Sequence, residues 1–258
     1  MTATATDDVL VEVDSGILTI TINRPEQRNA MTLAAATAIG EALTRLDDDP
    51  ELSVAILTGS AGTFCAGMDL KRFRLGERPV VEGRGFGGLV EAPPAKPLIA
   101  AVEGWALGGG FEMVLACDLV VAGSGAKFGL PEVKRGLAAR AGGIFRAPRV
   151  LPRAIALEML LTGEPITALD AKAHGLVNRV VEDGTAVAAA TTLARAISAN
   201  APLAVRASKA LALDARTWTD KESFERQATY TDPVFASADA AEGAAAFAER
   251  RAPRWQGR

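Results

Sequence analysis

The stretch "GWALGGGFEMVLACDLVV", from Gly104 to Val121, places three consecutive glycines, Gly108 to Gly110, directly before a segment with helical character. Glycine costs about 1 kcal/mol relative to alanine inside a helix, so three of them at a helix entrance need a reason. Two reasons are open. The glycines allow a strand and a helix to pack closely, or they leave the backbone N–H groups of a helix N-terminus accessible to a negatively charged group.

The residues that follow the glycines argue against a phosphate-binding loop. Such a loop needs Lys and then Ser or Thr after its last glycine, whereas Phe111 and Glu112 stand here, and the spacing G-x-G-x-x-G is missing. A helix entrance with bare amides instead suits an oxyanion that develops during a reaction.

A second segment, "GTFCAGMDLKRF" (62–73), repeats the order of strand, glycine turn and helix. We expect the amides of Met68 and Gly109 to face one position and to form an oxyanion hole, in which one donor can contribute about 3 to 4 kcal/mol of transition-state stabilisation. Asp69 follows the turn, where capping of the next helix is the favoured explanation.

The chain around these segments predicts an α/β fold. "VLVEVDSGILTITIN" has the alternation of a hairpin, and "MTLAAATAIGEALTRLDDD" has helical spacing with Thr32 as its N-cap. Short apolar runs that alternate with helical patterns predict further strands at 53–59, 97–104, 118–123 and 175–181. Strand patterns end near residue 183, so we expect a core over 1–183 and a helical region over 184–258.

Composition excludes several classes of function. The chain has 258 residues and a formal charge of −3, which gives no reason to expect nucleic acid or a membrane surface as a partner. No apolar run reaches the roughly 20 residues of a membrane span. Two cysteines, Cys65 and Cys117, fit a reduced interior, and no charged and then apolar leader is recognised, so a cytoplasmic location is expected.

The residues that could move protons are few. His174 is the only histidine, and its place before Gly175 predicts the end of a helix, so a serine triad or a multi-histidine metal site is not expected. Cys65 adjoins the presumed hole, but without a base it is expected to be a small buried hydrophobe.

Carboxylates therefore remain as candidates. Glu112 lies in the first turn of the glycine-led helix among apolar neighbours, which should raise its pKa, although neutralising the helix dipole is an alternative explanation. Glu132 follows Pro131 in an irregular stretch and, taken alone, reads as a surface residue. If the two carboxylates face each other, they can hold one water and exchange its protons.

The segment 71–96 is rich in glycine, proline and basic residues and has weak periodicity. A long irregular segment inside a compact domain is either functional or a solvated loop, and both interpretations stay open.

In order along the chain, the motifs "INRPEQRNAM", "FCAGMDL", "PLIAAVEGWALGGGFEMVLACDLVVA", "AKFGLPEVKRGL", "MLLTGEPITALDAKAHGLVNRVV" and "EGAAAFAERRAPRW" resemble the crotonase, or enoyl-CoA hydratase/isomerase, family nearly from end to end. The resemblance implies a spiral of repeated ββα units with a helical C-terminal region that makes trimers. A homotrimer, or a homohexamer built as a dimer of trimers, is the implied assembly.

The resemblance also implies an activity in fatty acid β-oxidation: reversible syn addition of water to a 2-trans-enoyl-CoA, with an acyl-CoA thioester as the partner. The amides of Met68 and Gly109 would hold the thioester oxygen. Glu132 would exchange a proton at the α-carbon, and Glu112 would position and activate the water. Coenzyme A is part of the substrate, and no metal or other cofactor is implied.

Further positions match the family's CoA-binding region. These are Arg28, Ala66, Asp69 and Leu70 near the adenine and pantetheine, and Lys209 and Phe247 on C-terminal helices that in relatives reach the CoA of a neighbouring subunit. Ordinary helix positions explain the last two equally well.

Two departures leave the acyl group open. Ala139 and Arg140 replace the Pro-Gly of typical fatty enoyl-CoA hydratases, and Met68 replaces their alanine. The alternatives are therefore an isomerase, a hydratase of a polar, branched or steroid-like acyl-CoA, or a non-catalytic acyl-CoA-binding homologue. A ClpP-like serine protease is disfavoured because His174 is a poor triad base.

Overall fold

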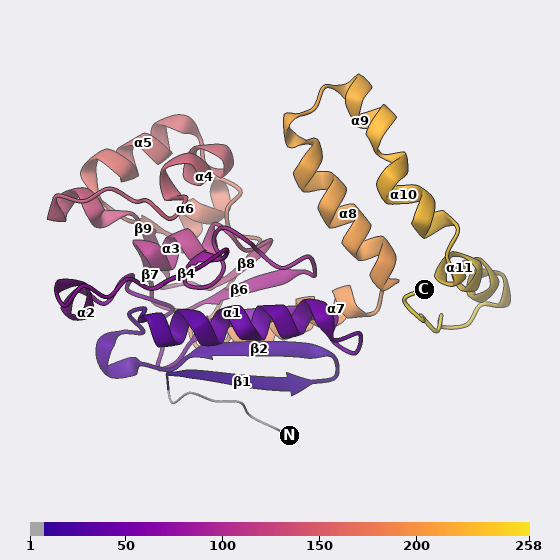
Figure 1. Cartoon of the computed structure of the whole chain (residues 1–258), viewed down its shortest axis with the longest axis horizontal. Helices are drawn as coiled ribbons and strands as arrows, with labels where there is room; N and C mark the ends of the chain where they lie inside the picture. Colours follow the sequence, from indigo (N-terminus) through magenta and orange to yellow (C-terminus); the bar gives the residue numbers. More distant parts are fainter. Residues whose placement is uncertain (1–7) are drawn as a thin grey trace.

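The computed structural model describes residues 8–258 and is built around a six-stranded sheet (Figure 1). The strand order is β1-β2-β3-β6-β8-β11, in which β1 and β2 are antiparallel and the remaining neighbours are parallel. The strands are β1 (Val9–Asp14), β2 (Ile17–Ile22), β3 (Val54–Gly59), β6 (Leu98–Val102), β8 (Leu119–Gly123) and β11 (Arg179–Val181).

The predicted hairpin and first helix are both present. β1 and β2 pair from Val9 with Ile22 to Asp14 with Ile17, and both turn residues between them have positive φ. Helix α1 (Leu33–Asp48) begins where the Thr32 side chain accepts the Ala35 amide, and its apolar side is buried against the sheet. These elements form from signals within a few residues of each turn or cap.

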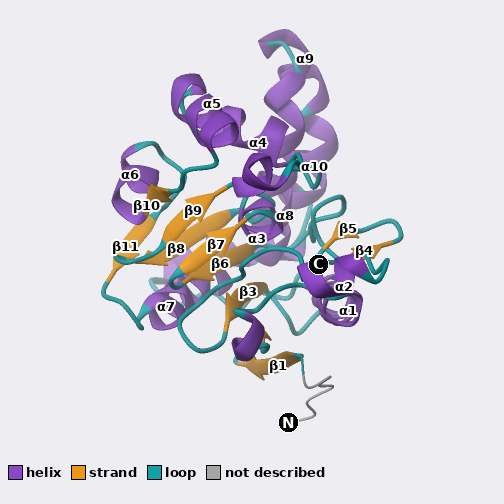
Figure 2. Ribbon diagram, turned by 90° about the vertical axis from the view of Figure 1, so that its left-hand side faces the viewer, coloured by secondary structure: helices purple, strands orange, loops and turns teal. Residues whose placement is uncertain are grey.

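A second, three-stranded sheet, with order β10-β9-β7, lies above the first. Its strands are β7 (Trp105–Leu107), β9 (Lys127–Gly129) and β10 (Ile166–Thr167). Each of two strands in the large sheet continues into a strand of the small one and then into a helical turn, as in β6, β7 and α3 (Gly109–Val114) or β8, β9 and η2 (Pro131–Arg135). This is the repeated ββα unit that the resemblance implies (Figure 2).

Helix α7 (Ala186–Ser198) covers the other face of the large sheet. Its alanines Ala186, Ala190 and Ala194 are fully buried against apolar side chains of β2, β3, β6 and β8. Alanine gives the close approach that this layer needs. By packing, α7 therefore belongs with the core, although it follows the boundary expected at residue 183; the division into two regions stays a prediction.

The last helices extend away from the sheet (Figure 1). They are α8 (Pro202–Asp214), η3 (Ala215–Thr217), α9 (Asp220–Arg226), α10 (Ala228–Phe235) and α11 (Ala238–Glu249). Shorter elements complete the described chain: η1 (Pro25–Gln27), α2 (Leu70–Arg74), β4 (Val80–Val81), β5 (Gly85–Phe86), α4 (Gly143–Val150), α5 (Arg153–Thr162) and α6 (Ala168–Ala173). None of these helices combines the length and the apolar character that crossing a bilayer requires.

The basic, glycine-rich segment 71–96 is not a wholly solvated loop. β4 and β5 form a small hairpin, and all residues from 85 to 90 are buried. The segment lies across α1, where Arg84 Nη2 donates to Thr44 Oγ1 at 2.6 Å and Gly88 sits against the backbone of Gly40. The absence of periodicity reflects close packing through glycine, because Gly88 leaves no room for a side chain.

Candidate active site

Two parallel segments bring Met68 and Gly109 to the same level. Cys65 pairs with Ala106 in an isolated parallel bridge, in which the Cys65 amide donates to Trp105 O at 2.9 Å and the Leu107 amide donates to Cys65 O at 3.0 Å. Met68 and Gly109 each lie three residues beyond this pair. The predicted meeting of the two glycine turns is therefore part of the sheet architecture.

Gly67 fixes the distance between the two turns. A β-carbon on Gly67 would lie 2.9 Å from Leu107 O and 3.5 Å from the Gly109 amide nitrogen, and the Gly67 backbone has φ +99°. A side chain is therefore excluded both by conformation and by the neighbouring strand. This close approach places the peptide that carries the Met68 N–H beside the entrance of α3.

Each of the three consecutive glycines has its own neighbour. A β-carbon on Gly108 would lie 3.1 Å from Glu132 Oε1, one on Gly109 would collide with the Phe86 ring, and one on Gly110 would collide with the Cys65 carbonyl. Close packing, the first of the two explanations, therefore accounts for Gly109 and Gly110. It also leaves the amides at the helix entrance unobstructed by side chains of their own.

The amides of Met68 and Gly109 are free in the sense that catalysis requires. Among the residues that the structure describes, neither N–H has a hydrogen-bond partner. The adjacent amides do have one: the Asp69 amide donates to Met31 O, and the Gly108 amide donates to Gly129 O. Gly109 is the first residue of α3, whose dipole is positive at this end. Two such donors can hold an oxygen that gains negative charge.

Asp69 caps α2, as predicted, and is also the partner of a buried cation. Its Oδ1 accepts the amides of Lys71 and Arg72, and its Oδ2 lies 3.2 Å from Arg24 Nη2. Both side chains are about nine-tenths buried. Burial alone would raise the pKa of Asp69, but the Arg72 amide, the Arg24 guanidinium and the Lys71 amide together hold it below its ordinary value.

Glu112 is 3% exposed, as the apolar residues beside it predicted. Its Oε1 accepts the amides of Ala141 at 2.7 Å and Gly143 at 2.8 Å. Desolvation raises the pKa of Glu112, and these two amides and the Arg146 guanidinium counteract part of that effect. The two amides therefore fix the orientation of the Glu112 carboxylate, and together with Arg146 they favour its ionised form.

Glu132 lies on η2 and is half-buried, so it is not the surface residue that its sequence context alone suggested. Its Oε2 is buried and has no hydrogen-bond partner within residues 8–258. Desolvation, together with repulsion from the Glu112 carboxylate, raises the pKa of Glu132 to about 7. The structure thus brings the two predicted carboxylates close enough to interact, and burial raises the pKa of both.

The other candidates have structural roles. His174 is the C-cap of α6, as expected. Cys65 is fully buried, and desolvation raises the pKa of its thiol to about 12. Across the described chain, no group of three His, Cys, Asp or Glu side chains is arranged to hold a metal ion.

The first group of predicted CoA-binding residues lies together beside the hole. The Ala66 amide donates to Arg28 O at 3.0 Å, the Arg28 side chain is exposed, and Leu70 is 43% exposed at the start of α2. Asp69 is the exception, since its carboxylate is engaged by Arg24 and by the helix cap. The contact that this residue can offer to a ligand is reduced accordingly.

Lys209 has the ordinary helix role that the sequence left open beside CoA binding. Its ammonium donates to Pro94 O at 2.8 Å, to Lys96 O at 2.9 Å and to Asp118 Oδ2 at 2.6 Å. All three N–H donors are thereby used within the chain, so Lys209 anchors α8 to the sheet. Phe247, by contrast, is 88% exposed on α11.

Sequence reasoning missed Arg146 and Phe86. Arg146 lies on α4 and acts on the Glu112 carboxylate, while the ring of Phe86 covers Gly109. Neither position has a local signal, because both contacts join segments more than twenty residues apart. In the first of the two departures from typical hydratases, Ala139 is buried and Arg140 is exposed; in the second, Met68 is half-buried.

Comparison with known proteins agrees with this architecture. Residues 12–258 match the family model described as enoyl-CoA hydratase/isomerase. The chain is 41% identical to enoyl-CoA hydratase EchA19 of Mycobacterium tuberculosis, with 97% of each chain covered. It is 43% identical to mevalonyl-coenzyme A hydratase sidH of Aspergillus fumigatus, with 93% of this chain and 91% of that one covered.

A crystal structure of an enoyl-CoA hydratase from Mycobacterium tuberculosis H37Rv superposes with a TM-score of 0.96. The identity is 54%, over 98% of this chain and 100% of the other. Fold, site and similarity define the same class: the chain belongs to the enoyl-CoA hydratase/isomerase, or crotonase, family. The predictions of this family, of its spiral α/β fold and of an enzyme of the hydratase kind are confirmed.

Proposed function

We propose that this protein adds water reversibly to the double bond of a 2-trans-enoyl-CoA. The observation that carries the proposal is the pair of interacting carboxylates, Glu112 and Glu132, next to two unpaired amides at Met68 and Gly109. Two amides favour the ionised form of Glu112 against the desolvation that raises its pKa, and the pKa of Glu132 is raised to about 7. This is the protonation pattern that a general base and a general acid need.

In the proposed reaction, Glu112 removes a proton from water while the water oxygen bonds to the β-carbon of the thioester. The electron pair of the double bond moves toward the carbonyl oxygen, which gains negative charge between the Met68 and Gly109 amides. Protonated Glu132 then delivers its proton to the α-carbon. A later proton transfer from Glu112 to Glu132 restores the starting pair, and the reverse sequence releases water.

The proposed CoA site uses Arg28, Ala66 and Leu70 beside the hole. Asp69 contributes through its backbone position and Lys209 through the placement of α8, while exposed Phe247 is kept for the CoA of a neighbouring subunit. A homotrimer or homohexamer is part of this proposal. So are a cytoplasmic location, which the two unpaired cysteines favour, and a reaction that needs no metal or further cofactor.

Hydration of crotonyl-CoA tests the proposal directly, because the absorbance of the conjugated thioester disappears as water adds. We expect turnover by the wild-type protein and a loss of roughly 100-fold to 10,000-fold in kcat for Glu112→Gln and for Glu132→Gln. Glu164→Gln is the control, since Glu164 is exposed and its carboxylate pairs with Lys134 alone among residues 8–258. Retained activity in both site variants would refute the assignment of the two carboxylates.

The same assay separates the other functions. Conversion of a 3-enoyl-CoA to the conjugated isomer without hydration would identify an isomerase. A preference for a branched, hydroxylated or steroid-sized enoyl-CoA over crotonyl-CoA would identify an atypical hydratase, a possibility that the similarity to a mevalonyl-coenzyme A hydratase supports. CoA thioester binding without turnover across such a panel would identify a non-catalytic binding protein.

A further inference from the structure

Arg146, on α4, reaches two segments at once. Its Nη2 donates to Val90 O at 2.6 Å, and its Nη1 donates to Ala141 O at 3.4 Å. The side chain passes directly over Gly142, because a β-carbon there would collide with Nη1. The guanidinium fork therefore holds the carbonyl side of the loop 141–143 whose amide side holds Glu112.

This loop is the support of the Glu112 carboxylate. Ala141 uses its N–H for Glu112 Oε1 and its C=O for Arg146, so one residue connects the cation to the acid. Gly143 supplies the second amide, and a β-carbon on it would lie 3.0 Å from Glu112 Oε1. Movement of the loop by a few tenths of an ångström would consequently change both bonds to the carboxylate.

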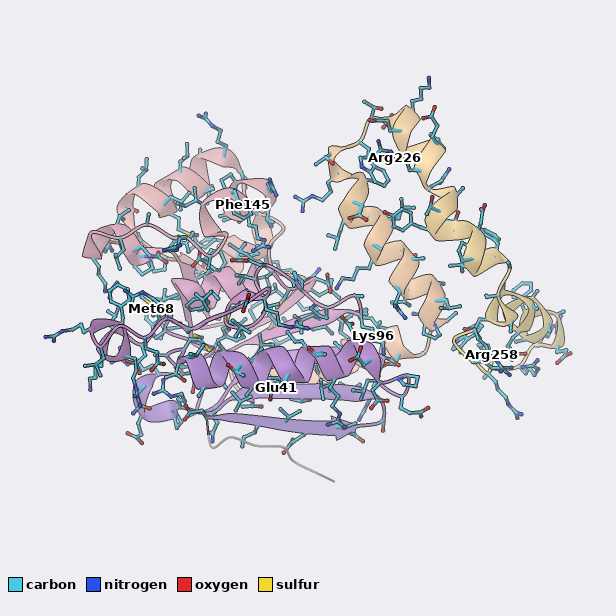
Figure 3. All side chains as sticks on the ribbon, in the orientation of Figure 1. Glu41, Met68, Lys96, Phe145, Arg226 and Arg258 are labelled. Carbon is cyan, nitrogen blue, oxygen red and sulfur yellow. The ribbon has the colours of Figure 1, made fainter. Side chains whose placement is uncertain are left out.

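The second segment reaches the oxyanion hole. Val90 is nearly fully buried, and its amide donates to Phe86 O at 3.3 Å. The Phe86 ring covers Gly109, one of the two proposed oxyanion donors. Arg146 thus connects the wall over Gly109 with the loop that holds Glu112 (Figure 3 labels its neighbour Phe145).

We infer that Arg146 is a positioning residue, which locks the loop 141–143 through its fork and stabilises the ionised form of Glu112 through its charge. This role goes beyond the proposed function and rests on the assignment of Glu112 as the base. Arg146 does not need to touch the substrate; it acts through Glu112 and through the segment that carries Phe86.

Few other groups within the described chain act on the same carboxylate. Glu132 on η2 faces Glu112 with a like charge, and Arg135 acts on Glu132 in turn. The Cys65 thiol, against the backbone of α3, stays neutral because burial raises its pKa. Arg146 is therefore the main source of positive charge that a substitution can remove from Glu112.

Three variants test the inference: Arg146→Gln, Arg146→Lys and the control Arg149→Gln. Arg149 lies on the same helix, and its guanidinium is 5.3 Å from the Phe145 ring, compared with 5.4 Å for Arg146. No bond from Arg149 to the loop 141–143 is present among the described residues. The control therefore removes an arginine and its cation–π contact without touching the support of Glu112.

We expect Arg146→Gln to lower kcat for crotonyl-CoA by roughly 10-fold to 100-fold, because misplaced catalytic groups have costs of that order. The acid limb of its pH–rate profile should move to higher pH. Arg146→Lys should return the acid limb toward the wild-type position, since the charge is kept, but it should not restore kcat fully because the fork is lost. Arg149→Gln should behave as the wild type in both respects.

Carboxylate NMR of the substrate-free protein, with the Glu112 signal assigned from Glu112→Gln, gives a readout independent of turnover. An unchanged Glu112 titration in Arg146→Gln, or an equal shift in Arg149→Gln, would overturn the inference. If Arg146→Gln does not fold, Arg146→Lys decides: wild-type kcat in that variant would refute the role of the fork. Absence of hydration by the wild type would refute the proposed function and leave the titration test intact.

Discussion

The Glu132 carboxylate oxygen Oε1 stands 3.1 Å from the point where a β-carbon on Gly108 would lie. Gly108 also has φ +54° and ψ −128°, a backbone conformation that residues other than glycine rarely adopt. Gly108, the residue before α3, and Glu132, the proposed acid, are therefore in such close contact that no side chain fits between them.

Gly108→Ala should therefore reduce activity and stability together. The new methyl group meets Glu132 and strains the backbone, so we expect a loss of about 1 to 3 kcal/mol in the free energy of unfolding and a marked fall in kcat. Thermal melting and the crotonyl-CoA assay measure the two effects. Gly136→Ala is the control, because Gly136 has φ +66° but open space around its Cα. That variant should lose stability alone, and an equal loss of kcat would contradict the role of contact with Glu132.

Glu132→Gln should stabilise the protein above neutral pH. The pKa of Glu132 is raised in the folded state to about 7 from 4.5, so ionisation of this group opposes folding. Its favourable contribution is complete below pH 4.5 and is lost as pH rises through about 7. Because the side chain is partly solvated, we expect a gain of only about 1 kcal/mol at pH 8, or roughly 2 to 4 °C in Tm.

Differential scanning fluorimetry at pH 5 and pH 8 checks this expectation. Wild type and Glu132→Gln should melt at closer temperatures at pH 5 than at pH 8. Glu164→Gln should show no such dependence, since Glu164 lies at the surface. A variant that is less stable than the wild type at pH 8 would mean that the Glu132 carboxylate has a partner in solution.

The pH dependence of kcat/KM should be bell-shaped. The proposed mechanism requires the pair of carboxylates to carry one proton, with Glu112 ionised and Glu132 protonated in the direction of hydration. The raised pKa of Glu112 sets the acid limb, and the alkaline limb should lie near pH 7. Hydration consumes no net proton, so the dehydration direction should give the same profile. A profile that stays flat from pH 6 to pH 9 would refute the shared proton.

Lys209→Met should destabilise the protein without weakening CoA binding. The Lys209–Asp118 pair is largely buried, and its loss leaves Asp118 without its cation, which should cost about 3 kcal/mol. The KM for crotonyl-CoA, measured below the melting temperature, should stay within twofold of the wild-type value. Lys134→Met removes an exposed pair with Glu164 and should cost less than about 1 kcal/mol. A large rise in KM for Lys209→Met would instead support a direct contact between Lys209 and CoA.

Local features of the fold were predictable because their causes are local. The Thr32 cap lies three residues from the amide that it accepts, and the turn of the first hairpin lies between the two strands that it joins. The helix after Gly108 was predicted as well, although it ends at Val114, because the Asp118 amide already donates to Leu98 O on the neighbouring strand β6. Tertiary pairing thus shortened an element whose composition favours a longer helix.

The site was predictable only in its parts. The glycine turns and the two acids are visible in the sequence, but their neighbours come from distant segments: Gly143 lies 31 residues from Glu112, and Asp118 lies 91 residues from Lys209. A lysine on an alanine-rich helix gives no indication that all its donors are occupied. The roles of Arg146 and Lys209 depend on where the segments meet, which periodicity does not encode.

The parallel pairing of β3 with β6 has a consequence for how the site can change. In this register Leu57 stands opposite Ala100, and beyond the two strands Cys65 pairs with Ala106, which is two residues out of that alignment. A slip by one residue would displace a donor by about 3.3 Å and turn its neighbours to the opposite face. The packing of the buried strands β3 and β6 therefore maintains the spacing between the Met68 and Gly109 amides. The proposed role of residue 68 uses only its main-chain N–H, so the Met68 side chain, which packs against the core, can be replaced without removing that donor.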